Sequence, residues 1–276
     1  MTAVSSSRTE PFERTVPLTL HSGDPEPLER VAFVLIGTSH PGNVGAAARA
    51  MRTMGVTDLR LVAPRFDDVA ERPEARAFAS GATGVLDGVR RFATLAEAIG
   101  DAALAVAVSA EPREFGPEPA PPEACAADAM AVLAADPAHR VAFVFGAERT
   151  GLSVDEVQAC GRLVSIPASP SYSSLNLAQA VQVLAYCVRR AALTAAAPAA
   201  PEPVRPGPRL ADHRAVGRLL EHGEQALGAI GFLDPGHPKK LVPRLRRLML
   251  RARLRPEEVD LLRGVLKLMV ERSRPR

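Results

Sequence analysis

Five short apolar runs, each followed by a helix-like segment, constrain the fold of this 276-residue chain more than any other feature. The runs occupy residues 31–36, 59–64, 104–110, 140–146 and 162–167. Apolar runs of this length are typical of strands buried on both faces, and their alternation with helical patterns predicts an α/β fold, a parallel sheet with helices on both faces. In such a sheet, ligands bind beyond the carboxyl ends of the strands. The helix-like segments lie at 45–54, 94–101, 121–135, 153–160 and 174–193.

Composition divides the chain into four parts. Residues 1–27 mix Ser, Thr, Pro and charge without periodicity and predict a disordered tail. Residues 28–195 form the predicted α/β domain. Prolines at 198, 201, 203 and 206 interrupt residues 196–210, which predicts an Ala/Pro-rich linker. Residues 211–276 predict a small helical C-terminal extension, with helices at 211–231 and 239–272 separated by the sequence DPGHP.

Charge is distributed unevenly. Residues 1–195 carry 17 Lys and Arg against 22 Asp and Glu, whereas residues 196–276 carry 17 against 9, so the extension is strongly basic. A basic segment beside a mildly acidic domain predicts a polyanionic partner, nucleic acid first and an anionic membrane surface second.

Other features narrow the class of protein. No apolar run approaches the ~20 residues that a membrane span needs, and the N-terminus lacks a signal-peptide core, so we expect a cytoplasmic protein without a membrane partner. The three cysteines are far apart and the histidines show no ligand spacing, so we expect no bound metal.

The first unusual loop follows the first apolar run. Gly42 and Gly45 free the backbone there, and three alanines at 46–48 leave the start of the predicted helix almost bare of side chains. Arg49, followed by Arg52 one turn later, is expected beside the helix N-terminus, where an anion is favoured. The alternative is an ordinary loop with solvated arginines.

The second loop, residues 145–156, resembles a phosphate loop only superficially. Gly146 and Gly151 have the required spacing, but no Lys follows, and no GxGxxG sequence follows a strand. Ser153 and Glu156 form a capping box, which explains both as helix-start residues. Gly146 and Glu148 are left without a purely structural explanation.

The third loop places several hydroxyls before a strongly apolar helix. Ser174 is expected to cap a helix that begins near Leu175. Tyr172, Ser173 and Asn176 exceed what a cap requires. They are either an exposed polar loop or part of a binding site.

Taken together, the three loops resemble the SpoU branch of the SPOUT superfamily, which comprises RNA ribose 2′-O-methyltransferases. The matching motifs, in the family's order, are Asn43-Val-Gly45-Ala-Ala-Ala-Arg49, Phe145-Gly146-Ala-Glu148-Arg-Thr-Gly151-Leu152, and Ile166-Pro167 with Ser174-Leu175-Asn176. The resemblance implies S-adenosylmethionine (SAM) as methyl donor, a C-terminal trefoil knot in the sheet domain, and a homodimer.

The resemblance also implies roles for individual residues. Cofactor-binding residues would be Val108, Ser109, Ala110, Gly146, Ile166, Ser173, Ser174 and Leu175. Catalytic residues would be Arg49, Ser174 and Asn43, and substrate-binding residues would be Arg52, Glu148, Asn176, Arg246, Arg247 and Arg251. The alanines at 46–48 would be approached by a second subunit or by the RNA backbone. The guanidinium of Arg49 stays protonated and so cannot accept a proton as a base. We therefore assign Arg49 to electrostatic support of the developing alkoxide.

Two positions depart from the family pattern. Glu111 stands where the family usually has Arg, with Arg113 two residues later, and Gly37 stands where an acidic residue is frequent. The first departure leaves the substrate contact of that loop open.

The resemblance therefore predicts SAM-dependent methylation of a ribose 2′-OH of tRNA, at the anticodon-loop nucleotide 32. Two alternatives remain open at this point: a ribosomal RNA 2′-O-ribose methyltransferase, and a non-catalytic RNA-binding dimer.

Overall fold

The structure is a computed structural model that describes residues 26–196 and 208–273, apart from Pro235 and Pro238. Most of the predicted tail (residues 1–25) and most of the predicted linker (residues 197–207) lie outside the described residues. The described chain begins with a short 3₁₀ helix, Glu26–Arg30, that leads into the first strand.

The described chain contains a seven-stranded sheet in which every pairing is parallel. The strand order is β3-β2-β1-β6-β4-β7-β5. The strands are β1 Val31–Ile36, β2 Asp58–Val62, β3 Arg90–Phe92, β4 Leu104–Val108, β5 Pro119–Ala120, β6 Val141–Phe145 and β7 Arg162–Val164. The predicted parallel α/β architecture is thus confirmed, and all five predicted strands are present. The sequence did not predict β3 and β5 because these edge strands are short and contain no apolar run.

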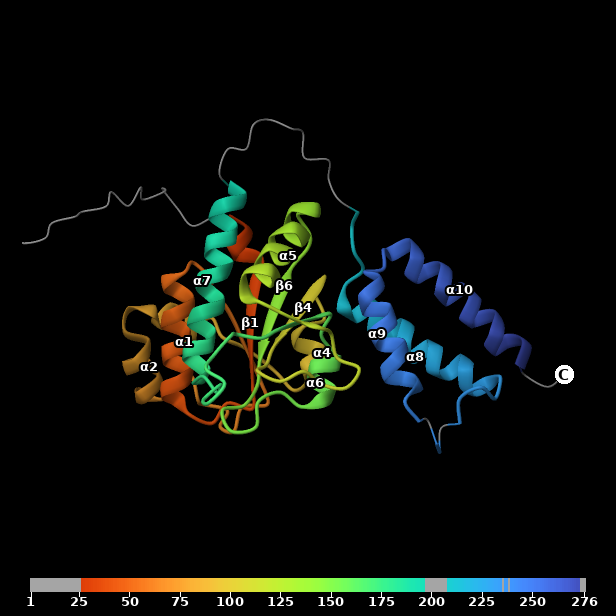
Figure 1. The fold of residues 1–276 in the computed structure, drawn as a ribbon, viewed down its shortest axis with the longest axis horizontal. Coiled ribbons are helices and arrows are strands. Elements are labelled where there is room, and N and C mark those ends of the chain that lie inside the picture. Colours follow the sequence, from red (N-terminus) through yellow and green to blue (C-terminus); the bar gives the residue numbers. More distant parts are fainter. Residues whose placement is uncertain (1–25, 197–207, 235, 238, 274–276) are drawn as a thin grey trace, which may run out of the picture.

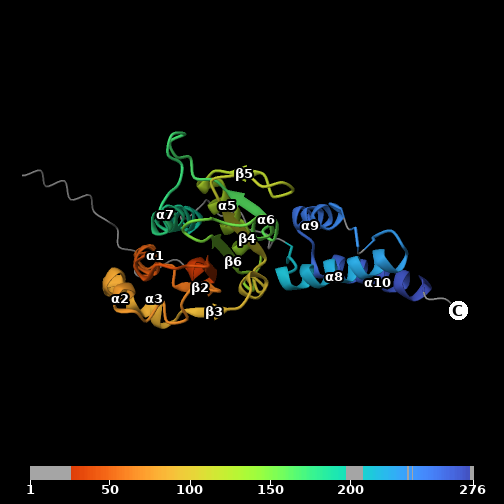
Figure 2. The same cartoon turned by 90° about the horizontal axis from the view of Figure 1, so that it is seen from below.

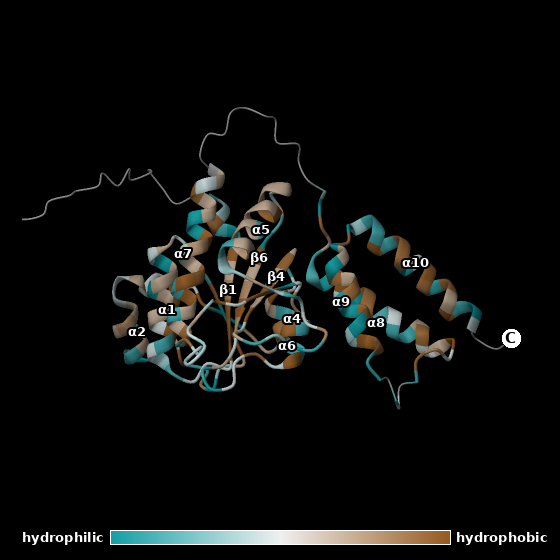
Figure 3. Ribbon diagram, viewed as in Figure 1, coloured by the Kyte–Doolittle hydropathy of each residue, from teal (hydrophilic) through white to brown (hydrophobic). Residues whose placement is uncertain are grey.

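Helices cover both faces of the sheet (Figure 2). They are α1 Pro41–Thr53, α2 Pro73–Ala79, α3 Thr83–Asp87, α4 Leu95–Ala98, α5 Pro122–Ala135, α6 Val154–Gln158 and α7 Leu177–Ala196. Side chains alternate along β1, so Phe33 packs with α1, α5 and α7 on one face and Val34 packs towards α4 and α6 on the other. The central strands are accordingly hydrophobic throughout (Figure 3).

Helix α1 departs from the sequence prediction in two ways. It begins at Pro41, so Arg49 lies in its third turn rather than beside its N-terminus. A Cβ on Gly45 would lie 2.0 Å from the carbonyl oxygen of Ala75, which shows how closely α2 crosses α1. Ala47 and Ala48 are fully buried within the chain. The expectation that a second subunit or RNA approaches residues 46–48 is therefore wrong for Ala47 and Ala48, because their small side chains serve packing inside the domain. For the half-buried Ala46 it stays a prediction.

The C-terminal helices lie to one side of the sheet domain, beside α4 and α6 (Figures 1 and 2). They are α8 His213–Ala229, α9 Leu241–Ala252 and α10 Pro256–Ser273, and they enclose a small apolar core of their own. The single helix predicted over 239–272 is wrong: Arg253 has a left-handed backbone that ends α9, and Pro256 begins α10.

The buried His139, the half-buried His213 and three ion pairs hold this segment against the sheet domain. His139 Nε2 accepts a hydrogen bond from the backbone N–H of Leu210 (2.8 Å), and His213 Nε2 accepts one from Ala105 (3.1 Å). Burial lowers the pKa of His213 to about 4, so it is a neutral acceptor at pH 7. The ion pairs are Lys240 with Glu114, Arg247 with Glu118 and Arg253 with Asp128.

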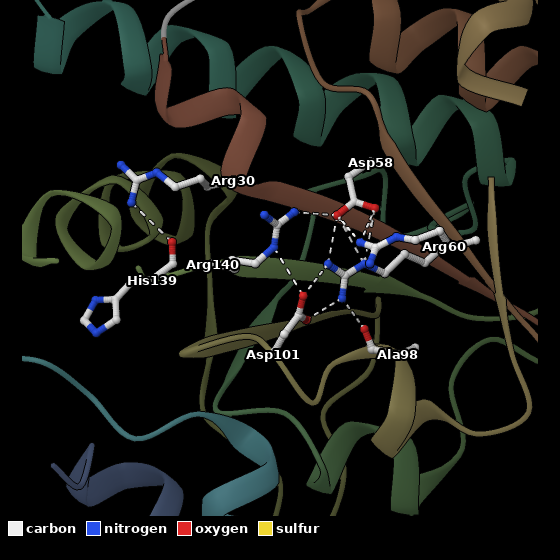
Figure 4. Close-up of polar contacts among 8 residues, drawn as sticks. Arg30, Asp58, Arg60, Ala98, Asp101, His139 and Arg140 are labelled. Atoms are coloured by element: carbon white, nitrogen blue, oxygen red, sulfur yellow. Dashed lines mark hydrogen bonds and ion pairs between the residues drawn. The ribbon is translucent and has the colours of Figure 1, made fainter. Parts of the chain in front are cut away.

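A charge cluster occupies the amino-terminal edge of the sheet, opposite the edge where ligands are expected (Figure 4). The side chain of Arg60 is 1% exposed and pairs with Asp58 (2.8 Å) and Asp101 (2.6 Å), while Arg90 and Arg140 also contact Asp58. Burial alone would raise the pKa of Asp58, but the hydrogen bonds and charges of Arg60 and Arg90 outweigh burial and lower it to about 2. The cluster joins the starts of β2, β4 and β6 and is part of the fold's stability rather than of the site.

Candidate functional site

An open cavity of about 290 Å³ lies at the carboxyl ends of β4, β6 and β7, against the start of α7. This is the edge at which a parallel sheet binds ligands. The structure brings all eight predicted cofactor residues into the lining of this one cavity, although they come from three loops far apart in the sequence. They are Val108, Ser109, Ala110, Gly146, Ile166, Ser173, Ser174 and Leu175.

The second motif forms a tight turn in the cavity wall. A Cβ on Gly146 would lie 2.1 Å from the carbonyl carbon of Gly151 and 2.3 Å from the backbone nitrogen of Leu152. Gly151 itself has φ of +64°, a conformation that favours glycine. Both motif glycines are therefore needed so that the loop can close on itself.

Glu148 connects the second motif to the first. Its carboxylate accepts hydrogen bonds from the backbone N–H groups of Ser39 (3.2 Å) and His40 (3.2 Å) and from Nδ2 of Asn43 (3.3 Å). Burial by itself would raise the pKa of Glu148. The hydrogen bonds from its own backbone, Asn43, His40 and Ser39 outweigh burial and lower the pKa, so the side chain is a carboxylate at neutral pH. These hydrogen bonds attach the Glu148 side chain to the loop that precedes α1 and to the first turn of that helix.

Asn43 and Asn176 connect the first motif to the third. Nδ2 of Asn176 donates to Oδ1 of Asn43 across 2.9 Å, although the two residues are 133 positions apart. Asn176 also caps α7, because its Oδ1 accepts from the N–H of Ala178 (2.9 Å) and Gln179 accepts from the N–H of Asn176 (3.2 Å). The predicted cap at Ser174 is therefore wrong, and the helix begins at Leu177.

With Asn176 as the cap, Ser173 and Ser174 are released from that structural role. Both are exposed and line the cavity. Tyr172 lies just before them with 79% of its surface exposed. The surplus of hydroxyls before an apolar helix therefore faces the cavity or the solvent around its mouth.

The structure does not bring the predicted arginines into the cavity of the described chain. Arg49 and Arg52 are exposed on α1 and do not line it. On α9, Arg246 is half-buried, while Arg247 and Arg251 line a different cavity, of about 330 Å³, between α9 and the sheet domain. Within one chain, the predicted cofactor residues line the cavity and the two asparagines connect its loops, but the predicted arginines lie outside its lining.

Several lining residues were not assigned from the sequence. Glu111 and Arg113 form an ion pair of 2.8 Å in the loop after β4, and Nη2 of Arg113 donates to the carbonyl of Leu152 (3.4 Å). Their position directly after a central strand was the available signal. Phe145, Ala147, Arg149, Thr150, Gly151, Leu177 and Ala180 also line the cavity.

Two other kinds of site are missing from the part of the chain that the structure describes. Its helices include none with the length and apolar character to cross a membrane. Nor does it bring together three or more His, Cys, Asp or Glu side chains in a group suited to a metal ion.

Comparison with known sequences identifies two matching families. The profile of the SpoU rRNA methylase family matches residues 30–186. A second profile, described as the tRNA methyltransferase TrmJ C-terminal domain, matches residues 214–276.

Individual proteins resemble the chain over most of its length. The tRNA (cytidine/uridine-2′-O-)-methyltransferase TrmJ of Klebsiella pneumoniae is 43% identical over 242 residues, which cover 87% of this chain and 96% of the relative. The crystal structure of TrmJ from Z. mobilis ZM4 has a TM-score of 0.73 at 32% identity and covers 86% of this chain and 98% of its own. A probable methyltransferase from Bordetella pertussis Tohama I has a TM-score of 0.58 at 45% identity, covering 61% and 99%.

Proposed function

This chain belongs to the SpoU rRNA methylase family, and from that premise we propose that it is a SAM-dependent methyltransferase acting on a ribose 2′-OH of tRNA. One observation supports the proposal most directly: residues of three separate loops, after β4, after β6 and between β7 and α7, converge on a single cavity at the carboxyl edge of the sheet. Relatives named as tRNA 2′-O-methyltransferases match both the sheet domain and the C-terminal helices.

The lining of the cavity fits SAM in size and chemistry. Its volume of about 290 Å³ is just below the ~300 Å³ at which the range for small-molecule pockets begins. Apolar side chains from Val108, Ile166 and Leu175 suit an adenine ring, while hydroxyls from Ser173 and Ser174 suit ribose oxygens. When bound, SAM supplies an electrophilic methyl group on a sulfonium that is a good leaving group.

The chain's own residues must then position the ribose and assist loss of its proton. We assign Ser174 to orienting the 2′-OH at the cavity mouth, with the proton passing to water or phosphate. Asn43 is a positioning residue, because it joins Glu148 to the cap of α7. Arg49 holds the RNA phosphate and stabilises the developing alkoxide, since a guanidinium donates hydrogen bonds but does not accept protons.

We further propose that the enzyme is a homodimer in which Arg49 acts across subunits. Arg49 is exposed and does not line the cavity of its own chain. A second copy whose α1 lies against the cavity would bring the guanidinium to the reacting ribose. The trefoil knot implied by the family is proposed for the segment between β6 and α7, whose loops after β6 and β7 both line the cavity.

A further part of the proposal concerns which nucleotide of the RNA is methylated. We propose the anticodon-loop nucleotide at position 32, with the α9 arginines Arg246, Arg247 and Arg251 contacting the tRNA backbone from the basic C-terminal segment. Ribosomal RNA is the second candidate, because the matching family profile is described by rRNA methylation. The C-terminal profile and the relatives favour tRNA.

Methyl transfer from radiolabelled SAM to bulk tRNA and to ribosomal RNA tests the proposal. We expect label in tRNA, resistant to alkaline hydrolysis at nucleotide 32, and loss of at least ~100-fold in rate for Arg49→Ala with unchanged calorimetric affinity for SAM. Label only in ribosomal RNA would establish the alternative. Absence of SAM binding by the wild-type protein would refute the enzymatic proposal.

Mixed dimers test the action of Arg49 across subunits. Arg49→Ala retains an intact cavity, and Gly146→Ala retains Arg49 but obstructs the cavity loop. If Arg49 acts on the partner's cavity, mixing these two inactive variants restores one working site per heterodimer. If Arg49 acts within its own chain, the mixture stays inactive, which would contradict the proposal.

A further inference from the structure

The cavity is lined by side chains of two distinct kinds. Val108, Ile166, Leu177 and Ala180 are apolar and come from β4, the loop after β7 and helix α7. Glu111 and Arg113 are charged and come from the loop after β4, and Arg113 also contacts the Leu152 carbonyl in the loop after β6. A ligand that uses both kinds of wall must itself carry an apolar part and a charged part.

Glu111 and Arg113 are presented as an ordered pair of opposite charges. Nη1 of Arg113 lies 2.8 Å from Oε2 of Glu111, and Nη2 donates to the Leu152 carbonyl at 3.4 Å. The Arg113 side chain is 24% exposed, so the guanidinium is held partly inside the wall, whereas the Glu111 carboxylate is 75% exposed. A planar guanidinium has five N–H donors, so these two contacts leave donors that a carboxylate of a ligand can use.

The loop that carries the pair is anchored at both ends. Ser109 Oγ donates to the carbonyl of Glu111 (3.0 Å), which forms a local turn directly after β4. Beyond Arg113, the side chain of Gln158, only 7% exposed, donates to the carbonyl of Glu114 (2.6 Å). The backbone that carries the two charges is therefore fixed by the fold, with the Arg113 guanidinium held partly inside the wall and the Glu111 carboxylate exposed beside it.

We propose that Glu111 and Arg113 bind the α-amino-acid end of the methyl donor. This inference rests on the proposed function, since it assigns one end of SAM to one wall of the cavity. SAM carries an α-carboxylate and an α-ammonium on one carbon, and the pair offers a guanidinium for the first and a carboxylate for the second.

Three ligands that differ at the amino-acid end test this assignment by isothermal titration calorimetry. SAM carries both charges, decarboxylated SAM keeps only the ammonium, and 5′-methylthioadenosine has neither. For Arg113→Met we expect ~10–100-fold weaker binding of SAM, as for loss of a charge-assisted hydrogen bond, with less than about a three-fold change for the other two ligands. For Glu111→Gln we expect SAM and decarboxylated SAM to weaken by about three- to ten-fold, because this carboxylate is more exposed, and methylthioadenosine to be unaffected.

Controls separate a direct contact from a structural effect. Arg113→Lys keeps the charge and should recover part of the lost SAM affinity. Arg76→Met removes an arginine from an exposed ion pair with Asp87, away from the cavity lining, and should change SAM affinity by less than about two-fold. Unchanged binding of methylthioadenosine by Arg113→Met shows that the cavity is still folded.

The outcomes distinguish this inference from the proposed function. If the wild-type protein binds none of the ligands, the proposed function itself fails. If the wild type binds SAM but Arg113→Met weakens all three ligands equally, the pair contacts the nucleoside and the assignment is overturned. If Arg113→Met leaves all three affinities unchanged while weakening tRNA binding, Arg113 contacts RNA phosphate and the assignment is likewise overturned.

Discussion

The charge cluster at the amino-terminal edge of the sheet predicts how the stability of the domain responds to removal of one carboxylate. In Asp58→Asn, the buried guanidinium of Arg60 keeps Asp101 as its only carboxylate contact among the described residues, and Asp58 no longer compensates Arg90 and Arg140 (Figure 4). Loss of one partner from a buried pair leaves a charge without compensation in a medium of low polarity, which is strongly destabilising.

The size of the effect follows from the pKa of Asp58. A shift from the ordinary value of 3.8 to about 2 corresponds to about 2.4 kcal/mol of stability at pH 7. The buried Arg60, left with Asp101 as its one carboxylate contact among the described residues, adds to this, so we expect Asp58→Asn to lower the free energy of unfolding by about 3–5 kcal/mol. Because the folded-state pKa is the lower one, this stability is complete above about pH 5 and falls as the pH drops through 3.8 towards 2. At pH 3 the linkage contribution of Asp58 is about half of its value at pH 7.

Urea unfolding followed by far-ultraviolet circular dichroism, at several pH values between 3 and 7, measures this difference for the wild type and the variant. Asp87→Asn is the matched control, because it removes a carboxylate from an exposed pair with Arg76 and should cost less than about 1 kcal/mol. Hydrogen exchange of the β2 amides reports locally on the same change. A loss below about 1 kcal/mol for Asp58→Asn at pH 7, or a difference from wild type that is the same at pH 3 and pH 7, would refute the reasoning.

Two further predictions concern the cavity loop and the docking of the C-terminal helices. Gly146→Ala should lower stability by about 1–3 kcal/mol and abolish measurable SAM binding in calorimetry, because its Cβ would collide with the backbone of Gly151 and Leu152. The control is Gly217→Ala in α8, whose Cβ meets no atom within 4 Å and which should stabilise the chain by about 0.5–1 kcal/mol. Wild-type SAM affinity in Gly146→Ala would contradict the argument. Burial lowers the pKa of His213 from 6.5 to about 4, so as the pH drops the unfolded state binds a proton before the folded state does. The free energy of unfolding should therefore fall by up to about 3 kcal/mol between pH 6.5 and pH 4. Faster hydrogen exchange of the Ala105 amide, which donates to His213, would report this loss. His213→Gln should remove this pH dependence and the exposed His237→Gln should keep it; an identical response of the two variants would show that His213 is not responsible.

Much of the architecture was predictable because its signals are local. The apolar runs that form β1, β4 and β6 identify themselves by composition, and strands buried on both faces need no partner to be recognised. Edge strands lack this signal: β3 is the sequence Arg-Arg-Phe, and β5 is two residues long. The helices α2 and α3 were not predicted either, since both are short and α2 follows a loop rich in charge.

Part of the cavity was also predictable, because the residues that directly follow a strand can be identified from local sequence. Gly146 and the residues after β4 and β7 take their place from the strands they follow, so their convergence is a consequence of the parallel sheet. The cap of α7 was misassigned, although the spacing of Asn176 and Gln179 carried the signal. The bond from Asn43 to Asn176 joins positions 133 apart and has no local signature.

By itself, the sequence determined the parallel α/β class and the edge of the sheet at which the site forms, because both depend on the order of residues along a strand and the loop after it. The family resemblance added eight of the residues that line the wall of the cavity. Only the tertiary structure decided that Glu148 and Asn43 join the loops, that Ala47 and Ala48 pack inside the domain, and that Arg49 is absent from the lining of its own cavity. Those outcomes depend on how α1 is pressed between α2 and α7, and contacts between distant segments are set by the packing of whole elements rather than by the residues next to them in the chain.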